Sequence, residues 1–206
     1  MHRERRPVRE MVLCILLLLA LTLVPEVSQA QRRGGRGETS PTLGLEQGTV
    51  DLQAPGLQLS LVRASQTVAA LRPESAPDFD FTPGRRLEQR AFDLNYHLGD
   101  VTLMVRPAGA DGEWRRLDTA QRRRPVESLE AEAPVLAAAD LAATLPEDAP
   151  VGVRRFWEVD NGVLALRFEV TNRSDAPLEI GAFGMPLVFN NILDGHSLDD
   201  AHAICS

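Results

Sequence analysis

Two alternating segments meet at an Asn-Gly pair, and this feature constrains the fold more than any other. The segment 151–159 is rich in valine and aromatic residues and runs into Asp160-Asn161-Gly162. After the pair, four apolar residues alternate with other side chains: Leu164, Leu166, Phe168 and Val170. Since Asn and Gly both tolerate positive φ, the pattern predicts a β-hairpin whose apolar face turns toward a core.

Shorter extended segments recur along the chain. Leu57, Leu59 and Leu61 alternate with other residues, and 68–71 is expected to pair with them after a turn at Ala64-Ser65. Further strands are predicted at 78–81, within 96–105 with Val101, Leu103 and Val105 on one face, and from Leu178 onward. Short strands separated by turns, without alternating long helices, predict a mainly β chain that forms an antiparallel, supersandwich-like β-sandwich.

The segment 131–143 is ambiguous. Its many alanines are compatible with a short helix, but Pro134, Pro146 and Pro150 interrupt the region. A strand that ends at Asp140-Leu141 fits equally well, so both alternatives stay open.

The N-terminus has the three parts of a secretory signal. Four arginines lie within residues 1–10, residues 11–24 are almost entirely apolar, and Ser28-Gln29-Ala30 offers small residues for cleavage after Ala30. We predict a signal peptide at 1–30 and a periplasmic or extracellular protein with no stable membrane anchor after cleavage. A retained anchor is the alternative, although the apolar run is short for a spanning helix.

The rest of the chain divides into a predicted flexible linker at 31–47 and a sandwich domain at 48–206. An apolar content of 44% is enough for a packed core, and a net charge of −7 does not favour a nucleic-acid partner. Cys14 lies in the predicted signal peptide, which leaves Cys205 without an intramolecular disulfide partner.

The chain also contains two arginine clusters and one sequon. Arg122–Arg124 and Arg154-Arg155 are interpreted as solvated surface, with an anion site as the alternative. Asn172-Arg173-Ser174 fits the N-glycosylation pattern, but the same residues make a good turn, which is the favoured interpretation.

Trp114 and Trp157 are the candidate carbohydrate-binding residues, with Tyr96 and Phe156 beside them as a possible stacking platform. Aromatic residues make up only 5% of the chain, so the core competes for them. Glu158, Asp160 and Asp194 could supply the carboxylates of a glycosidase, but no spacing selects a pair, and the catalytic residues stay unknown.

Residues 194–202 form the most polar cluster, with His196, His202 and three aspartates. Such side chains can bind zinc, but the spacing matches no zinc signature. A helix start capped by Ser197 is the favoured interpretation. We expect no metal and no cofactor.

Several segments resemble the N-terminal part of an uncharacterised family of large secreted proteins classed with six-hairpin glycosidases. These segments are 139–141, 155–157, 166–172, 179–186, 189–192 and 201–206. The resemblance implies a β-sandwich that precedes an (α/α)6 toroid. It carries no catalytic residue onto this chain.

The resemblance also implies that relatives continue past Ser206, so we expect the sandwich to be incomplete at its C-terminus and the toroid to be absent. The expected function is that of a sandwich fragment of a secreted glycoside-hydrolase-like protein acting on polysaccharide, inactive by itself. The alternatives are a non-catalytic carbohydrate-binding module and an interaction module of the cell envelope with open sheet edges.

Overall fold

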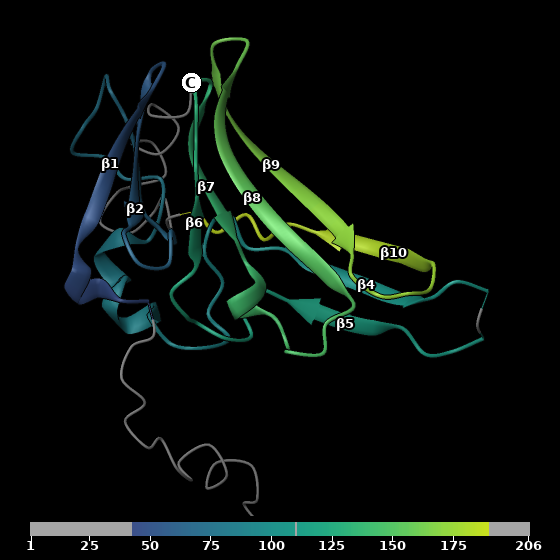
Figure 1. The fold of residues 1–206 in the computed structure, drawn as a ribbon. Coiled ribbons are helices and arrows are strands. Elements are labelled where there is room, and N and C mark those ends of the chain that lie inside the picture. The colour runs from purple at the N-terminus through teal and green to yellow at the C-terminus, as the bar shows by residue number, and fades with distance from the viewer. Residues whose placement is uncertain (1–42, 110, 190–206) are drawn as a thin grey trace, which may run out of the picture. The chain divides into compact units, whose positions relative to one another are not determined.

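The computed structural model describes residues 43–109 and 111–189, and it is built mainly from antiparallel strands (Figure 1). The strands are β1 Thr49–Ala54, β2 Leu57–Val62, β3 Val68–Pro73, β4 Thr102–Pro107, β5 Arg115–Asp118, β6 Glu127–Leu129, β7 Val135–Asp140, β8 Val151–Asp160, β9 Val163–Asn172 and β10 Leu178–Gly184. Short 3-10 helices lie between them: η1 Leu45–Gln47, η2 Gly84–Arg86, η3 Glu88–Arg90 and η4 Ala142–Thr144.

The described strands form three sheets. Sheet A has the order β1-β2-β3, sheet B the order β10-β4-β5, and sheet C the order β6-β7-β8-β9. Neighbouring strands are antiparallel throughout. The prediction of a mainly antiparallel β fold is confirmed, and the arrangement is sandwich-like.

The predicted hairpin is the longest element of the fold. β8 and β9 pair over ten residues each without a register shift, and only Asn161 and Gly162 separate them. These two residues have φ values of 49° and 81°, as a tight two-residue turn requires. Figure 1 shows the hairpin running from this turn, at the top, down to the strands of sheet B.

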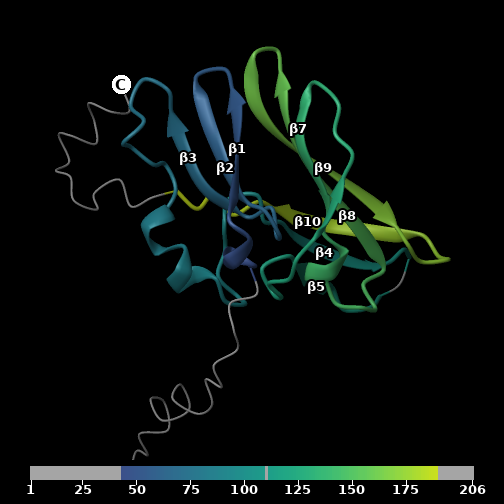
Figure 2. The same cartoon turned by 60° about the vertical axis from the view of Figure 1, so that its left-hand side comes forward.

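One face of this hairpin packs against two separate hydrophobic cores. Near the start of β8, Val151 and Val153 pack with Leu103 and Leu117 of sheet B. Farther along β8, Trp157 packs with residues of sheet A, among them Leu59 and Leu61. Sheet C therefore forms one layer, and sheets A and B cover different parts of its inner face (Figure 2).

The predicted inward face of β9 follows the same division. Leu164 and Leu166 pack against the core that contains Trp157, whereas Phe168 and Val170 pack against the core of sheet B. All four side chains are partly buried.

The opposite face of sheet A has its own small core. Leu43, Val62, Ala69 and Ala91 are buried there, and Leu45 of η1 and Leu87 pack against them. Buried Leu43 lies within residues predicted as the end of the linker, so the packed part begins before residue 48.

The strands predicted at 57–62 and 68–71 are confirmed as β2 and β3, but the strand predicted at 78–81 is wrong. The Oδ1 atom of Asp80 accepts hydrogen bonds from the backbone nitrogens of Leu71 (3.0 Å) and Thr82 (2.8 Å). This carboxylate takes the place that a carbonyl of a neighbouring strand would occupy, so the segment runs beside β3 as a turn.

Two other boundaries differ from expectation. β4 begins at Thr102 rather than near Tyr96, although Val101, Leu103 and Val105 are all buried as predicted. The ambiguous alanine-rich segment forms strand β7, which ends at Asp140, followed by the 3-10 turn η4.

Several predictions fall outside the described residues. They concern the signal peptide and its cleavage at Ala30, both cysteines, and the polar cluster 194–202. Within the described ranges, no helix is long and apolar enough to span a membrane.

Substitutions in the core and at the hairpin tip should differ in their effect on the free energy of unfolding. Replacing buried Leu103 by alanine should lower the free energy of unfolding by about 2–5 kcal/mol, because a cavity forms between sheets B and C. Replacing Val163, which is exposed at the hairpin tip, should change it by less than about 0.5 kcal/mol. Urea unfolding measures both, and equal losses would contradict this assignment of the core.

Candidate functional site

The outer face of sheet B brings an exposed aromatic ring together with charged and polar side chains. Alternation places Leu103, Val105 and Leu117 in the core, so their neighbours along the strands point outward. The outward residues are Thr102, Met104 and Arg106 of β4 and Arg116 and Asp118 of β5, followed by Trp114 where the chain enters β5.

Trp114 lies at one end of this face and is 38% exposed. The guanidinium carbon of Arg106 is 4.4 Å from the centre of its ring, a cation–π contact. The backbone of Gly181 in β10 supports the ring: a Cβ atom there would lie 2.8 Å from two ring carbons. Glycine at 181 therefore allows the indole to lie close against the sheet.

A carboxylate completes this end of the face. Arg106 Nε donates to Glu179 Oε2 at 2.8 Å, and the backbone nitrogen of Gly109 donates to Glu179 Oε1 at 3.1 Å. The Gly109 hydrogen bond and then Arg106 hold the pKa of Glu179 below its ordinary value. An aromatic ring, a guanidinium and a carboxylate thus lie on three adjacent strands.

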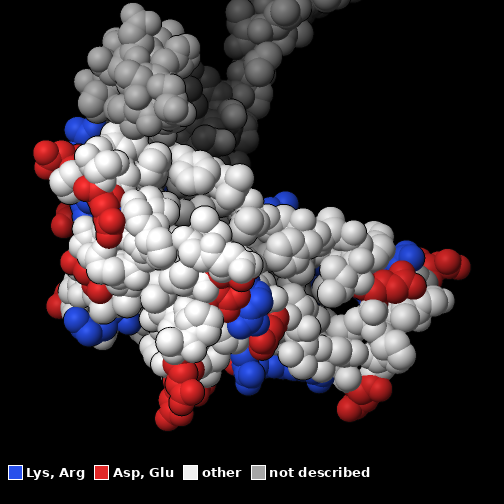
Figure 3. Space-filling model, turned by 90° about the horizontal axis from the view of Figure 1, so that it is seen from above, with Lys and Arg blue, Asp and Glu red and all other residues white. Residues whose placement is uncertain are grey.

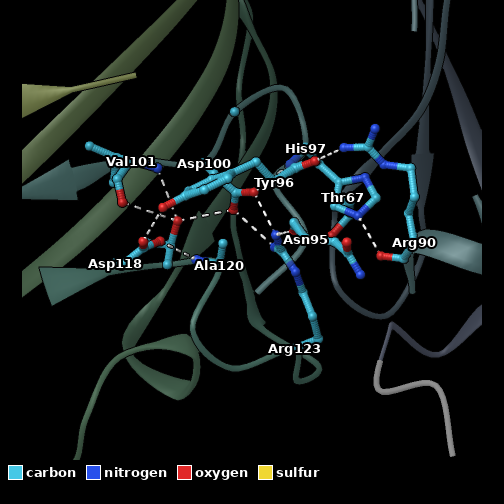
Figure 4. A network of polar contacts seen from close by, with 12 residues as sticks. Thr67, Arg90, Asn95, Tyr96, His97, Asp100, Val101, Asp118, Ala120 and Arg123 are labelled. Carbon is cyan, nitrogen blue, oxygen red and sulfur yellow. Dashed lines mark hydrogen bonds and ion pairs between the residues drawn. The ribbon is translucent and has the colours of Figure 1, made fainter. Parts of the chain in front are cut away.

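A second set of hydrogen-bonded polar side chains lies at the other end of the face. The Tyr96 hydroxyl donates to Asp118 Oδ2, and Arg116 Nη2 donates to the Tyr96 oxygen at 2.8 Å. The hydrogen bond with Asp118 raises the pKa of Tyr96 above its ordinary value. Figure 4 shows Tyr96 and Asp118 at the margin of a larger polar network.

Trp157 is placed differently from Trp114. It is 3% exposed and packs in the core between sheets A and C, so it has no ring face available to a ligand. Phe156 points to the outer side of sheet C, where Arg167 covers its ring at 4.1 Å. The structure therefore does not join the two tryptophans, Phe156 and Tyr96 into one stacking platform.

A buried polar network lies beneath sheet B. Arg123 donates from Nη1 to Asp100 Oδ1 (2.9 Å) and from Nη2 to Asp100 Oδ2 (2.6 Å), a bidentate pair with both side chains buried. Asp100 also accepts from the Thr119 hydroxyl (3.0 Å) and the His97 backbone nitrogen (2.7 Å), as Figure 4 shows.

Arg155 joins this network from β8. It donates to the backbone oxygens of Gly99 (3.1 Å) and Gln66 (2.6 Å), and burial lowers its pKa to about 10. The interpretation of both arginine clusters as solvated surface was therefore wrong for Arg123 and Arg155. Each is buried because distant parts of the chain supply its acceptors.

One signal in the sequence could have located Arg155 and Trp157. The two-residue turn fixes the hairpin register, which pairs Arg155 with Phe168 and Trp157 with Leu166. Residues that pair across a hairpin share a face. Both side chains could therefore have been assigned to the inner face from the positions of Phe168 and Leu166, but the sequence analysis did not use the register in this way.

The network has a structural role rather than a catalytic one. The cavity beside Asp100, Arg123 and Arg155 has a volume of about 10 Å³, which is room for about one water molecule. Burial alone would raise the pKa of Asp100, but the hydrogen bonds and charge of Arg123 outweigh it and lower the pKa. The carboxylate therefore stays ionised.

A second, larger hollow lies beside β3. It has a volume of about 450 Å³, and its lining includes Arg72, Asp78, Phe79 and Arg85. Asp80 also lines it, and its hydrogen bonds to Leu71 and Thr82 shape the wall. This hollow is a further location where an aromatic ring and charged groups meet.

Of the predicted carboxylates, Glu158 and Asp160 have partners at the surface, and Asp194 lies outside the described residues. Glu158 accepts from Arg167 Nε at 3.0 Å, and Asp160 lies at the hairpin turn, where it accepts from Asn161. Asn172 uses its side-chain amide to close the predicted turn, donating to the Ala176 oxygen at 2.8 Å. On the face seen in Figure 3, acidic and basic side chains form small mixed groups separated by uncharged surface.

Residues 43–109 and 111–189 supply neither a metal-binding cluster nor a carboxyl group with a raised pKa. In these ranges no group of three or more His, Cys, Asp or Glu side chains is placed to hold a metal ion. The carboxyl groups whose pKa is shifted there, those of Asp100, Asp148 and Glu179, are all shifted downward. A general acid for glycoside cleavage needs a raised pKa.

The sequence was compared with models of known protein families, and one of them matches most of the chain. The model of the family described as "Family of unknown function (DUF5695)" matches residues 60–206. The chain belongs to this family. No curated protein and no solved structure matches the chain. In this DUF5695 member the matched region begins within β2 and includes Trp114, Asp100 and Arg155. Membership of an uncharacterised family is thereby confirmed, and the resemblance to six-hairpin glycosidases stays a prediction.

Removing the charge of Asp100 should destabilise the fold strongly. Asp100→Asn leaves Arg123 and Arg155 buried without a counter-charge, at an expected loss of about 3–5 kcal/mol in unfolding free energy. Asp111→Asn, at an exposed position, is the matched control and should have little effect. Chemical denaturation compares them, and a loss below about 1 kcal/mol for Asp100→Asn would show that the network is dispensable.

His97 should make stability depend on pH. Burial and then the charge of Arg123 lower its pKa to about 4, and its Nε2 lies 3.0 Å from the Arg90 oxygen. The unfolded chain takes up this proton near pH 6.5, so stability should fall by at most about 3 kcal/mol as pH drops from 6.5 to 4.

His97→Gln can keep the hydrogen bond to Arg90 and removes the titration. The difference between the two unfolding free energies should therefore vary with pH over this range and be constant above about pH 7. If the unfolding free energies of the wild type and the variant changed in parallel with pH, the lowered pKa of His97 would not be the cause of the pH dependence.

Proposed function

We propose that this chain is the non-catalytic β-sandwich module of an exported carbohydrate-active protein and that it binds glycan on the outer face of sheet B. The observation that carries the proposal is partly exposed Trp114, which lies against Gly181, with the guanidinium of Arg106 over its ring and Glu179 bonded to that guanidinium. An indole face packs against the apolar side of a sugar ring, and the charged pair can bond to ring hydroxyls.

The polar groups at both ends support the same ligand class. Arg106 with Glu179, and Arg116 with Asp118 and Tyr96, present donors and acceptors in fixed positions on one sheet face. Trp114 and Asp118 are four residues apart along the chain, which corresponds to roughly 13 Å in a strand. An extended chain of hydroxyl-rich rings fits such a face better than a compact ligand does.

Catalysis is assigned to another part of the intact protein. This part of the proposal rests on the resemblance to six-hairpin glycosidases, in which a toroid follows the sandwich. It agrees with the downward-shifted pKa values of Asp100, Asp148 and Glu179, none of which suits a general acid. Export follows from the predicted signal peptide with cleavage after Ala30.

The binding proposal is tested by polysaccharide affinity. The purified chain should be retained by at least one member of a panel of insoluble and soluble polysaccharides, and Trp114→Ala should lower the affinity about tenfold or more, because the ring contributes most of the apolar contact. Affinity electrophoresis and pull-down both measure this effect.

Phe156→Ala is the matched control, since it removes an aromatic ring from the outer side of sheet C. It should leave glycan affinity unchanged. Loss of binding in both variants, or retention of binding in Trp114→Ala, would place the glycan elsewhere. Absence of binding by the wild type across the whole panel would end the proposal.

A further inference from the structure

The strand β9 ends sheet C with a long edge. Among the strands that the structure describes, β9 pairs only with β8, and their register runs unbroken from Val163 to Asn172. Natural sheets interrupt or cover edges of this length, because unpaired peptide groups attract another strand. A regular ten-residue edge therefore suggests that another strand binds there.

The hairpin turn defines which peptide groups face outward. In a hairpin closed by a two-residue turn, Asp160 and Val163 exchange hydrogen bonds, and every second residue of β9 then bonds toward β8. The intervening residues point their N–H and C=O groups to the open edge: Leu164, Leu166, Phe168 and Val170. Their side chains lie on the inner, apolar face.

Uncovered apolar surface lies next to this edge. Ile180 and Phe183 of β10 pair with Val105 and Leu103, which are buried in the core, so they lie on the inner face of sheet B. They are nevertheless 52% and 51% exposed. Phe183 meets Phe168 of β9 edge to face, with ring centres 5.9 Å apart. A strand added beside β9 would lie next to Phe183, which contacts Phe168 at this edge.

We propose that this strand is β9 of a second copy of the chain, paired antiparallel about Phe168. The sequence of β9 is complementary to itself in this register. Arg167 lies opposite Glu169 of the partner subunit, and the same pair recurs on the other side of the two-fold axis. Leu166 lies opposite Val170 of the partner subunit on the inner face.

The neighbouring registers are excluded by charge. An antiparallel pair whose outward-pointing peptide groups meet can be centred on any residue of β9, and the registers next to that of Phe168 are centred on Arg167 and on Glu169. Centring on Arg167 places two arginines opposite each other, and centring on Glu169 places two glutamates opposite each other. Only the Phe168 register brings opposite charges together.

The charged residues are already held in position for this pairing. Arg167 bonds to Glu158 at 3.0 Å and to Glu169 at 2.6 Å while it stacks on Phe156. Less side-chain freedom is then lost on association. Two four-stranded C sheets would join into one eight-stranded sheet, and the outer face of sheet B with Trp114 would stay exposed. The inference does not depend on glycan binding.

Sedimentation of the full purified chain over a wide concentration range tests the proposal. The wild type should form dimers. Arg167→Glu should raise the dimer dissociation constant about tenfold or more, because two attractive pairs become repulsive. Arg122→Glu, an exposed charge reversal before β6, is the control and should dimerise like the wild type.

The double variant Arg167→Glu/Glu169→Arg restores opposite charges in the same register and should dimerise again. Hydrogen exchange identifies the surface: the amide of Phe168 should be protected in the dimer and should exchange rapidly in the Arg167→Glu monomer. A wild type that stays monomeric, a dimer with rapid exchange at Phe168, or a double variant that does not recover would each overturn the proposal.

Discussion

The described structure depends on one inner strand face that serves two cores. Val153, Arg155 and Trp157 follow one another on the inner side of β8. Val153 packs with sheet B, Trp157 packs with sheet A, and Arg155 lies between them. Arg155 therefore places its guanidinium where the two cores meet. Hydrogen bonds to the backbone oxygens of Gly99 and Gln66 hold it there, because neither core alone surrounds the whole side chain with apolar groups.

This junction explains why the most perturbed ionisable groups do not form an active site. Asp100 neutralises the charge of buried Arg123. The second buried arginine, Arg155, donates instead to the backbone oxygens of Gly99 and Gln66. Removing such charges from water is costly. The bidentate Arg123–Asp100 pair and the hydrogen bonds of Arg155 to backbone oxygens offset part of that cost, whereas the Nε atoms of Arg123 and Arg155 are buried without a hydrogen-bond partner. The side chains that we propose to bind glycan lie outside this network, on the exposed face with Trp114 and Glu179.

Local patterns allowed part of the fold to be predicted. The Asn161-Gly162 turn and the alternation around it specify β8 and β9, because both depend only on nearby residues. The partners of Arg155 and Arg123 could not be found in this way. Gly99 and Gln66 lie 56 and 89 residues from Arg155, and Asp100 lies 23 residues from Arg123. The alternating segment 78–81 failed as a strand because the Asp80 side chain competes with the backbone.

We expect β8 to unite the two cores into one cooperative unit, and native-state hydrogen exchange tests this coupling most directly. The amides of β2, in sheet A, and of β4, in sheet B, are predicted to exchange through openings of the same free energy, equal to that of global unfolding. If β2 exchanged through a much less costly opening while β4 stayed protected, the two cores would be independent and this account would be contradicted.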